Sequence, residues 1–118
     1  MFEKDLSYAE KLDVYGNVLS ERRREVLTYY YDDDLSLSEI AEVMGSISRQ
    51  GVRDAIKRGE AELDRLEELL GLAKSARTLS MLTERTDSLI RRCDGLSQKE
   101  IKAELMAILE ALHALSDE

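Results

Sequence analysis

Apolar residues recur at steps of three and four along most of this chain, the spacing that lines up side chains on one face of an α-helix. Near the N-terminus the pattern predicts a first helix over about residues 2–18, weakened at its end by Gly16 and Asn17. The inward-facing positions of this helix are Phe2, Leu6, Ala9, Leu12, Tyr15 and Leu19.

A second helix is expected after Ser20, because serine caps helix N-termini by accepting a hydrogen bond from a free backbone amide. Its apolar positions are Val26, Leu27 and Tyr30. The adjacent aspartates of Asp32–Asp34 repel one another and therefore predict a solvated turn after it.

The spacing of Ser36 and Glu39 is that of a capping box, in which each side chain bonds the backbone amide of the other residue. It predicts the start of a third helix, and Gly45 suits the left-handed conformation that ends one. Ser48 is expected to cap a fourth helix that runs to about Leu70. The inward positions of the third helix are Leu37, Ile40, Ala41 and Met44.

After Gly71 two further apolar series appear, separated by an Asp94-Gly95 turn and a second capping box at Ser97 and Glu100. Such series suit either an antiparallel helical pair or the contact between two subunits. The first series is Leu79, Leu82, Thr86, Leu89 and Cys93, and the second is Ile101, Leu105, Ile108, Leu112 and Leu115.

Composition supports an all-α fold, since the 118 residues include no proline and only six glycines. Two short helices joined by a turn, the second carrying cations, indicate a helix-turn-helix in the first part of the chain. We therefore expect a helix-turn-helix domain over residues 1–70. Residues 71–118 are expected to add a helical hairpin that can serve as a dimerisation element.

The chain carries 25 acidic and 17 basic residues, a formal net charge of −8 that repels polyanions at long range. Two short regions depart from this balance. Residues 46–58 hold four cations against one acid, and a second basic run comprises Arg22, Arg23 and Arg24. Any contact with nucleic acid is expected to involve these two regions.

Other functional classes find little support in the sequence. Cys93 is the only cysteine and His113 the only histidine, so neither a disulfide nor a metal site is expected. No catalytic constellation or cofactor-binding motif stands out, and an enzyme is not expected. The charged N-terminus is unlike a secretory signal, and no apolar window approaches the roughly 18 residues of a membrane span, so we expect a cytoplasmic protein.

The fourth helix has two contrasting faces when residues are placed at about 100° intervals. Its apolar face packs on the second and third helices, and its polar face suits insertion into a DNA major groove. The apolar face consists of Val52, Ile56, Gly59 and Leu63, and the polar face of Arg49, Gln50, Arg53, Asp54 and Lys57.

Arginine can bond guanine through two hydrogen bonds, and glutamine can do the same with adenine. We therefore expect base contacts from Arg49, Gln50, Arg53 and Lys57. Phosphate contacts are expected from side chains near the start of the helix and on the second helix, since such contacts position a protein on the duplex. These residues are Ser48, Arg58, Arg22, Arg23 and Arg24.

The alternative reading is that these cations form the solvated face of an ordinary amphipathic helix. Asp54 lies within the polar face and would repel phosphates, unless it pairs with Lys57 or Arg58 one turn further along.

The segment SERRREVLTYYYDDDLSLSEIAEVMG-SISRQGVRDAIKRGEAEL resembles the YlxM family of small bacterial proteins, most clearly in the block ISRQ.V.DAIKR. The similarity is strong over residues 3–70 and weaker over residues 71–118. The same segment looks like region 4 of bacterial sigma factors, which contacts promoter DNA. The resemblance implies a DNA-binding helix-turn-helix protein linked to the signal recognition particle pathway.

The sequence departs from this family pattern in two ways. The turn between Glu42 and Ile47 is one residue longer, which is expected to change the angle of the fourth helix. Gly51 and Gly59 stand where relatives tend to have alanine or another helix former. Each glycine is expected to destabilise the helix by about 1 kcal/mol relative to alanine. These departures and the acidic net charge favour a second hypothesis. In it, the protein is an adaptor that binds the protein or RNA of the signal recognition particle, and does not bind DNA.

Overall fold

The computed structural model describes residues 4–116, so the predicted inward position of Phe2 lies outside the described residues. The elements follow the order α1, η1, α2, η2, α3, α4, α5, η3 and α6, all of them helical. The all-α fold is therefore confirmed. The chain divides into two compact units, Met1–Ala73 and Lys74–Glu118.

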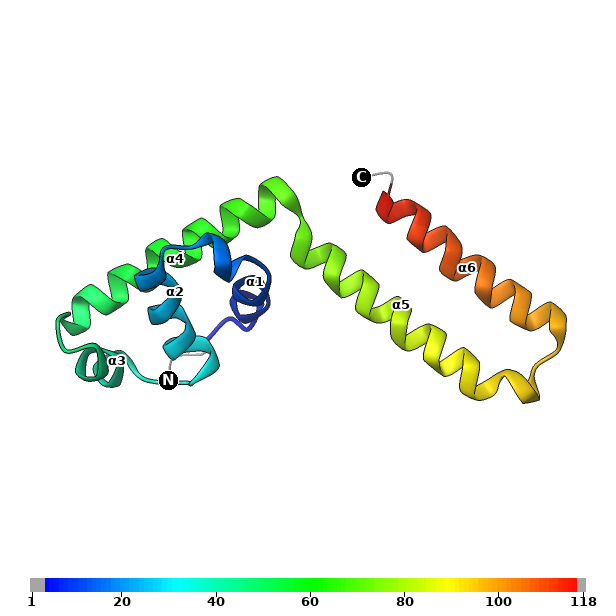
Figure 1. Cartoon of the computed structure of the whole chain (residues 1–118), viewed down its shortest axis with the longest axis horizontal. Helices are drawn as coiled ribbons and strands as arrows, with labels where there is room; N and C mark the ends of the chain where they lie inside the picture. The colour runs from blue at the N-terminus through cyan, green and yellow to red at the C-terminus, as the bar shows by residue number, and fades with distance from the viewer. Residues whose placement is uncertain (1–3, 117–118) are drawn as a thin grey trace. The chain divides into compact units, whose positions relative to one another are not determined.

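The first unit is built on one long helix, α4 (Arg49–Leu70). The shorter helices α1 (Ser7–Tyr15), α2 (Glu21–Leu27) and α3 (Leu37–Met44) all pack against it (Figure 1). Apolar side chains from the four helices form one core. Its most deeply buried members are Tyr15, Val26, Leu27, Ile40, Val52 and Leu63.

The first helix is shorter than predicted. It begins at Ser7, whose amide bonds the Asp5 side chain (2.9 Å), and it gives way to a 3₁₀ turn, η1 (Gly16–Val18). Leu6 precedes the helix and is 74% exposed, so its expected inward position is wrong. Leu19 does reach the core, but from extended backbone beyond the helix.

The second helix is capped as predicted, because the Ser20 hydroxyl accepts a hydrogen bond from the Arg23 amide. It continues into a π-helical turn, η2 (Thr28–Asp32), which places Tyr30 in the core. The side chains of Asp32–Asp34 are exposed, in agreement with the predicted solvated turn.

The predicted capping box of α3 is present. The Ser36 hydroxyl accepts from the Glu39 amide (3.1 Å), and the Glu39 carboxylate accepts from the Ser36 amide (3.0 Å). Gly45 ends α3 with a φ of 72°, and Gly71 ends α4 with a φ of 62°. Both lie in the left-handed region that favours glycine, so these helix ends follow from local sequence.

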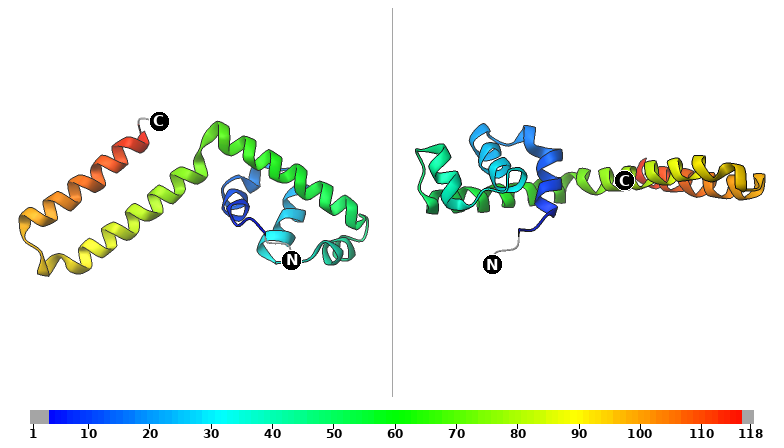
Figure 2. Two further views of the ribbon diagram at one scale, coloured as in Figure 1. Left: turned by 180° about the vertical axis from the view of Figure 1, so that it is seen from behind. Right: turned by 90° about the horizontal axis from the view of Figure 1, so that it is seen from below.

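The second unit is an antiparallel hairpin formed by α5 (Leu72–Arg92), a 3₁₀ turn η3 (Cys93–Gly95) and α6 (Gln98–Ser116) (Figure 2). The Ser97 hydroxyl accepts from the Glu100 amide (3.1 Å), as the second capping box requires. The Glu100 carboxylate, however, accepts from the Ser97 hydroxyl (3.0 Å) where an amide was predicted, so only half of the box forms.

The apolar series of the hairpin are only partly buried. Leu82, Leu89 and Ile108 form its core, whereas Leu79 and Leu105 are each about half exposed. Some predicted apolar positions stay exposed because each helix of a pair covers only part of the circumference of the other. None of the helices within residues 4–116 has a stretch long and apolar enough to cross a membrane.

Candidate nucleic-acid interface

A turn between two capped helices positions the candidate site. Gly45 closes α3, and the Ser48 hydroxyl opens α4 by accepting a hydrogen bond from the Gly51 amide (3.0 Å). The intervening residues include Ile47, whose half-buried side chain packs against the core. This arrangement fixes the start of α4, and with it the direction of the side chains in its first turns.

The two faces of α4 are divided as the sequence predicts. Val52 and Leu63 are fully buried, and Ile56 is 6% exposed. The side chains of Arg49, Gln50, Arg53, Lys57 and Arg58 are exposed instead. None of the four cations among them has an ion pair within residues 4–116.

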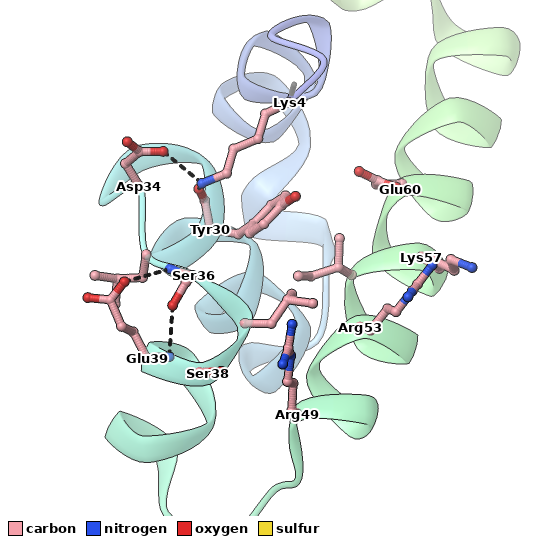
Figure 3. Close-up of a pocket in the computed structure, with 13 residues that line it drawn as sticks. Lys4, Tyr30, Asp34, Ser36, Ser38, Glu39, Arg49, Arg53, Lys57 and Glu60 are labelled. Atoms are coloured by element: carbon pink, nitrogen blue, oxygen red, sulfur yellow. Dashed lines mark hydrogen bonds and ion pairs between the residues drawn. The ribbon is translucent and has the colours of Figure 1, made fainter. Parts of the chain in front are cut away.

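Three of these cations, Arg49, Arg53 and Lys57, line a groove of about 530 Å³ between α3 and α4 (Figure 3). Tyr30 and Ile56 are among the side chains that line it more deeply. The groove therefore combines an apolar floor with cations along its α4 wall.

The acids of the groove are already bonded within the protein. Asp34 accepts from Lys4 (2.7 Å), Glu39 accepts from the Ser36 amide, and Glu60 accepts from the Tyr31 hydroxyl. The hydrogen bond from the backbone of Ser36 lowers the pKa of Glu39, so this carboxyl stays ionised. None of these three acids forms an ion pair with Arg49, Arg53 or Lys57, although the donors to Glu39 and Glu60 are neutral groups that do not cancel a carboxylate's charge.

Lys4 is a groove residue that sequence reasoning missed. Its ammonium donates to the Tyr30 carbonyl (2.6 Å) and lies 4.1 Å from the centre of the Tyr30 ring. No short-range pattern marks this lysine, because its partners lie at least 26 positions further along the chain.

Among the described residues Asp54 does not pair with Lys57 or Arg58, so the condition under which it would not repel phosphates is not met. Its carboxylate accepts a hydrogen bond from the Gln50 amide group (3.1 Å), one turn earlier on the same helix. Gln50 is thus held by a residue that repels phosphates, while its second amide proton and its carbonyl oxygen make no hydrogen bond to the described residues.

The predicted phosphate contacts on α2 lie outside the groove. Arg22 is exposed, whereas Arg23 forms an ion pair with Glu62 of α4. Arg24 is exposed and makes a long hydrogen bond to Asn17 (3.4 Å). Of the three arginines, Arg22 is therefore the most accessible to a ligand.

Three carboxylates spaced along α4 bond tyrosines from the other elements of the unit. Tyr8 donates to Asp64 (2.7 Å), Tyr15 donates to Glu67 (2.6 Å), and Tyr31 donates to Glu60. We call these three pairs the tyrosine–carboxylate row. The three acids lie at helical spacing in the sequence. Their tyrosine partners could not be predicted, because they lie at least 29 positions away along the chain.

The row explains how an acidic chain can present a cationic surface. The second half of α4 carries five of its six acids, and four of these five bond tyrosines or Arg23 within the unit. The first half carries four of the five α4 cations without an ion pair among the described residues. Positive and negative groups are thus separated along a single helix.

Comparison with known proteins agrees with this geometry. The family model described as "Putative helix-turn-helix protein, YlxM / p13 like" matches residues 2–103. A UPF0122 protein of Halalkalibacterium halodurans is 38% identical over 115 residues, covering 98% of this chain and 99% of the relative.

Two further relatives carry the same family name. A UPF0122 protein of Acetivibrio thermocellus is 59% identical over 61 residues, which cover 52% of this chain and 51% of the relative. One of Thermoanaerobacter sp. is 36% identical over 100 residues, covering 85% and 82% respectively. No solved structure shows a significant match to the chain. With its capped helix-turn-helix and a match across most of its length, the chain belongs to the UPF0122 family of YlxM / p13-like helix-turn-helix proteins.

Proposed function

We propose that the protein is a non-enzymatic, cytoplasmic regulator that binds duplex DNA through the first turns of α4. The observation that carries the proposal is that α4 buries one face and presents Arg49, Arg53 and Lys57 on another, without ion pairs among the described residues. A helix of this kind fits a major groove, where arginine reads guanine. Gln50 contributes a fourth base contact through the amide proton and the carbonyl oxygen that Asp54 leaves available.

Phosphate contacts in this proposal come from Ser48, Arg58 and the basic run Arg22–Arg24. The Ser48 hydroxyl accepts the cap bond from Gly51, so its own proton can still be donated to a phosphate oxygen. Arg23 contributes least, because Glu62 already neutralises its charge. These groups set the position of the head on the duplex and carry no sequence preference.

A single head of this kind makes few contacts, so its affinity is modest and depends strongly on salt. We therefore propose that the protein acts as a homodimer. Residues 1–70 form the reading head and residues 71–118 form the dimerisation element. Two heads on one duplex would read half-sites about one helical turn apart.

The proposal is tested by fluorescence anisotropy of labelled duplex DNA at 50 and 200 mM salt. Arg53→Glu should abolish binding, whereas Arg65→Glu, an equal charge change near the other end of α4, should leave most of it. Binding by the native chain should fall steeply between the two salt concentrations. Equal loss in both variants, or binding without salt dependence, would exclude this face of α4 as the contact.

A second candidate function is an adaptor role in the signal recognition particle pathway. The observation that favours it is the net charge of −8, which suits a basic protein partner. The bond between Gln50 and Asp54 also opposes contact with phosphates. Co-precipitation of the full chain with the particle's protein and RNA tests this role, and retention of neither would remove its support.

A further inference from the structure

The hairpin of α5 and α6 leaves more of its large apolar side chains exposed than it buries. Only Leu82, Leu89 and Ile108 form its buried core. A unit of this size rarely gains enough stability from so small a core without a partner. The exposed set, from 39% to 69% exposed, is Leu79, Met81, Ile90, Leu105, Met106, Leu109 and Leu112.

Three of these seven residues line one shallow groove on the hairpin. The groove has a volume of about 380 Å³ and is lined by Leu79 and Ile90 from α5 and by Leu112 from α6. Asp87 is its one charged lining residue, and it is already paired with Arg91 (3.1 Å). The surface is therefore neutral as well as apolar.

A ridge continues this surface on α6. Leu105 and Leu109 are each about half exposed and precede Leu112 by seven and three positions, which places all three on one side of the helix. We call the groove and this ridge together the hairpin face. A ridge beside a groove can fit the same surface of an identical molecule turned by a two-fold rotation.

We infer that the hairpin face binds the hairpin face of a second copy of this chain, and that the two hairpins close a four-helix bundle. This inference rests on the proposed homodimer and assigns its contact surface. Four amphipathic helices can bury the apolar stripes that two leave in water. A strongly charged partner fits poorly, since the face offers it no unpaired charge. A second copy fits because two neutral faces meet without the repulsion expected elsewhere between chains of net charge −8.

The test measures the mass of the full chain in solution by light scattering over a range of micromolar concentrations. The native chain should have twice the 13.4 kDa mass of one chain. Ile90→Glu should raise the dissociation constant of the dimer at least about tenfold, because a carboxylate would be buried among apolar groups. Ile90 is 65% exposed in the single chain, so the hairpin itself tolerates the change.

Met81→Glu is the matched control. Met81 is 69% exposed and lies two positions from Leu79, so it points away from the hairpin face. Dimers should persist in this variant, and circular dichroism should show native helix content in both. Leu105→Glu provides a second disruption on the facing helix, and its loss of dimer should match that of Ile90→Glu.

A native chain that remains monomeric at 100 μM, or a dimer that both Ile90→Glu and Leu105→Glu leave intact, would overturn the inference. DNA binding is scored separately. Arg53→Glu should remain dimeric whether or not DNA is the partner of α4, so failure of the DNA proposal does not change this result. If Ile90→Glu is monomeric and still binds DNA weakly and in a salt-dependent way, the hairpin face supplies the dimer contact and residues 1–70 supply the DNA contact.

Discussion

Gly59 of α4 lies so close to Leu27 of α2 that a Cβ atom added at Gly59 would stand 2.7 Å from Leu27 Cδ1 and 3.1 Å from Leu27 Cγ. Leu27 is fully buried and has no room to turn away. Helical spacing places this glycine on the apolar face of α4, but it does not show which side chain lies against it. In the structure it is the position that lets α2 pack directly on α4.

We predict that Gly59→Ala lowers the free energy of unfolding by about 1 kcal/mol. Overpacking a core costs roughly 1–3 kcal/mol, and the better helix propensity of alanine returns about 1 kcal/mol. Urea denaturation measures the difference. Gly51→Ala is the control, because it has the same propensity gain of about 1 kcal/mol but its Cβ would meet Ile47, which is only half-buried and can move. We therefore expect Gly51→Ala to be no less stable than the native chain. A stabilising effect of Gly59→Ala would contradict the packing explanation.

The tyrosine–carboxylate row predicts a loss of stability in alkali. The hydrogen bond to Asp64 is the main cause that raises the pKa of Tyr8, to about 12, and burial is the main cause that raises the pKa of Tyr15 and Tyr31. An unfolded tyrosine ionises near pH 10. The stabilisation is therefore complete below about pH 10 and is lost as the pH rises towards 12, because the unfolded state releases its protons first.

Absorbance at 295 nm, followed as the pH is raised, measures this titration. In Asp64→Asn the Tyr8 hydroxyl can still bond an amide oxygen but no longer faces a negative charge, so its pKa should fall towards the ordinary value of about 10. Asp13→Asn removes an exposed carboxylate from the same helix as Tyr8 and serves as the control. An unchanged titration in Asp64→Asn would show that this bond does not shift the pKa of Tyr8.

The first amides of α5 depend on one phenol. The Tyr15 hydroxyl accepts from the Leu72 amide (3.0 Å) and donates to Glu67, which in turn accepts from the Ala73 amide (2.9 Å). Tyr15→Phe keeps the buried ring and removes this connection, and we predict a loss of about 1–2 kcal/mol in unfolding free energy. Hydrogen exchange should quicken at Leu72. Unaltered exchange at Leu72 would mean that a water molecule replaces the phenol as acceptor and that the hydroxyl does not stabilise the start of α5.

The bond between Gln50 and Asp54 predicts that DNA binding improves when the negative charge is removed. Asp54→Asn keeps an amide oxygen that can accept from Gln50, yet it no longer repels phosphates. Affinity for duplex DNA should rise, by less than about tenfold, because one surface charge is worth about 1 kcal/mol or less. Fluorescence anisotropy measures this, with Asp13→Asn on α1 as a matched control. Weaker binding by Asp54→Asn would favour the adaptor role over the DNA proposal.

Features that depend on neighbouring residues could be predicted from the amino-acid sequence. Ser20, Ser36 and Ser48 cap the helices that follow them, and Gly45 and Gly71 end the helices that precede them. Helix caps and left-handed ends are set within a few residues, so a local reading can find them. The two faces of α4 were predictable for the same reason, since helical spacing alone separates them.

Which polar groups remain available to a ligand depends on how the helices pack. Tyr31 bonds Glu60, Arg23 pairs with Glu62, and Lys4 reaches Asp34, each across at least 29 positions of the chain. Such pairings depend on how the helices pack, and no local pattern records them. The helical positions of the cations on α4 follow from the sequence, whereas their lack of partners follows from the fold, which commits the nearby acids to other residues.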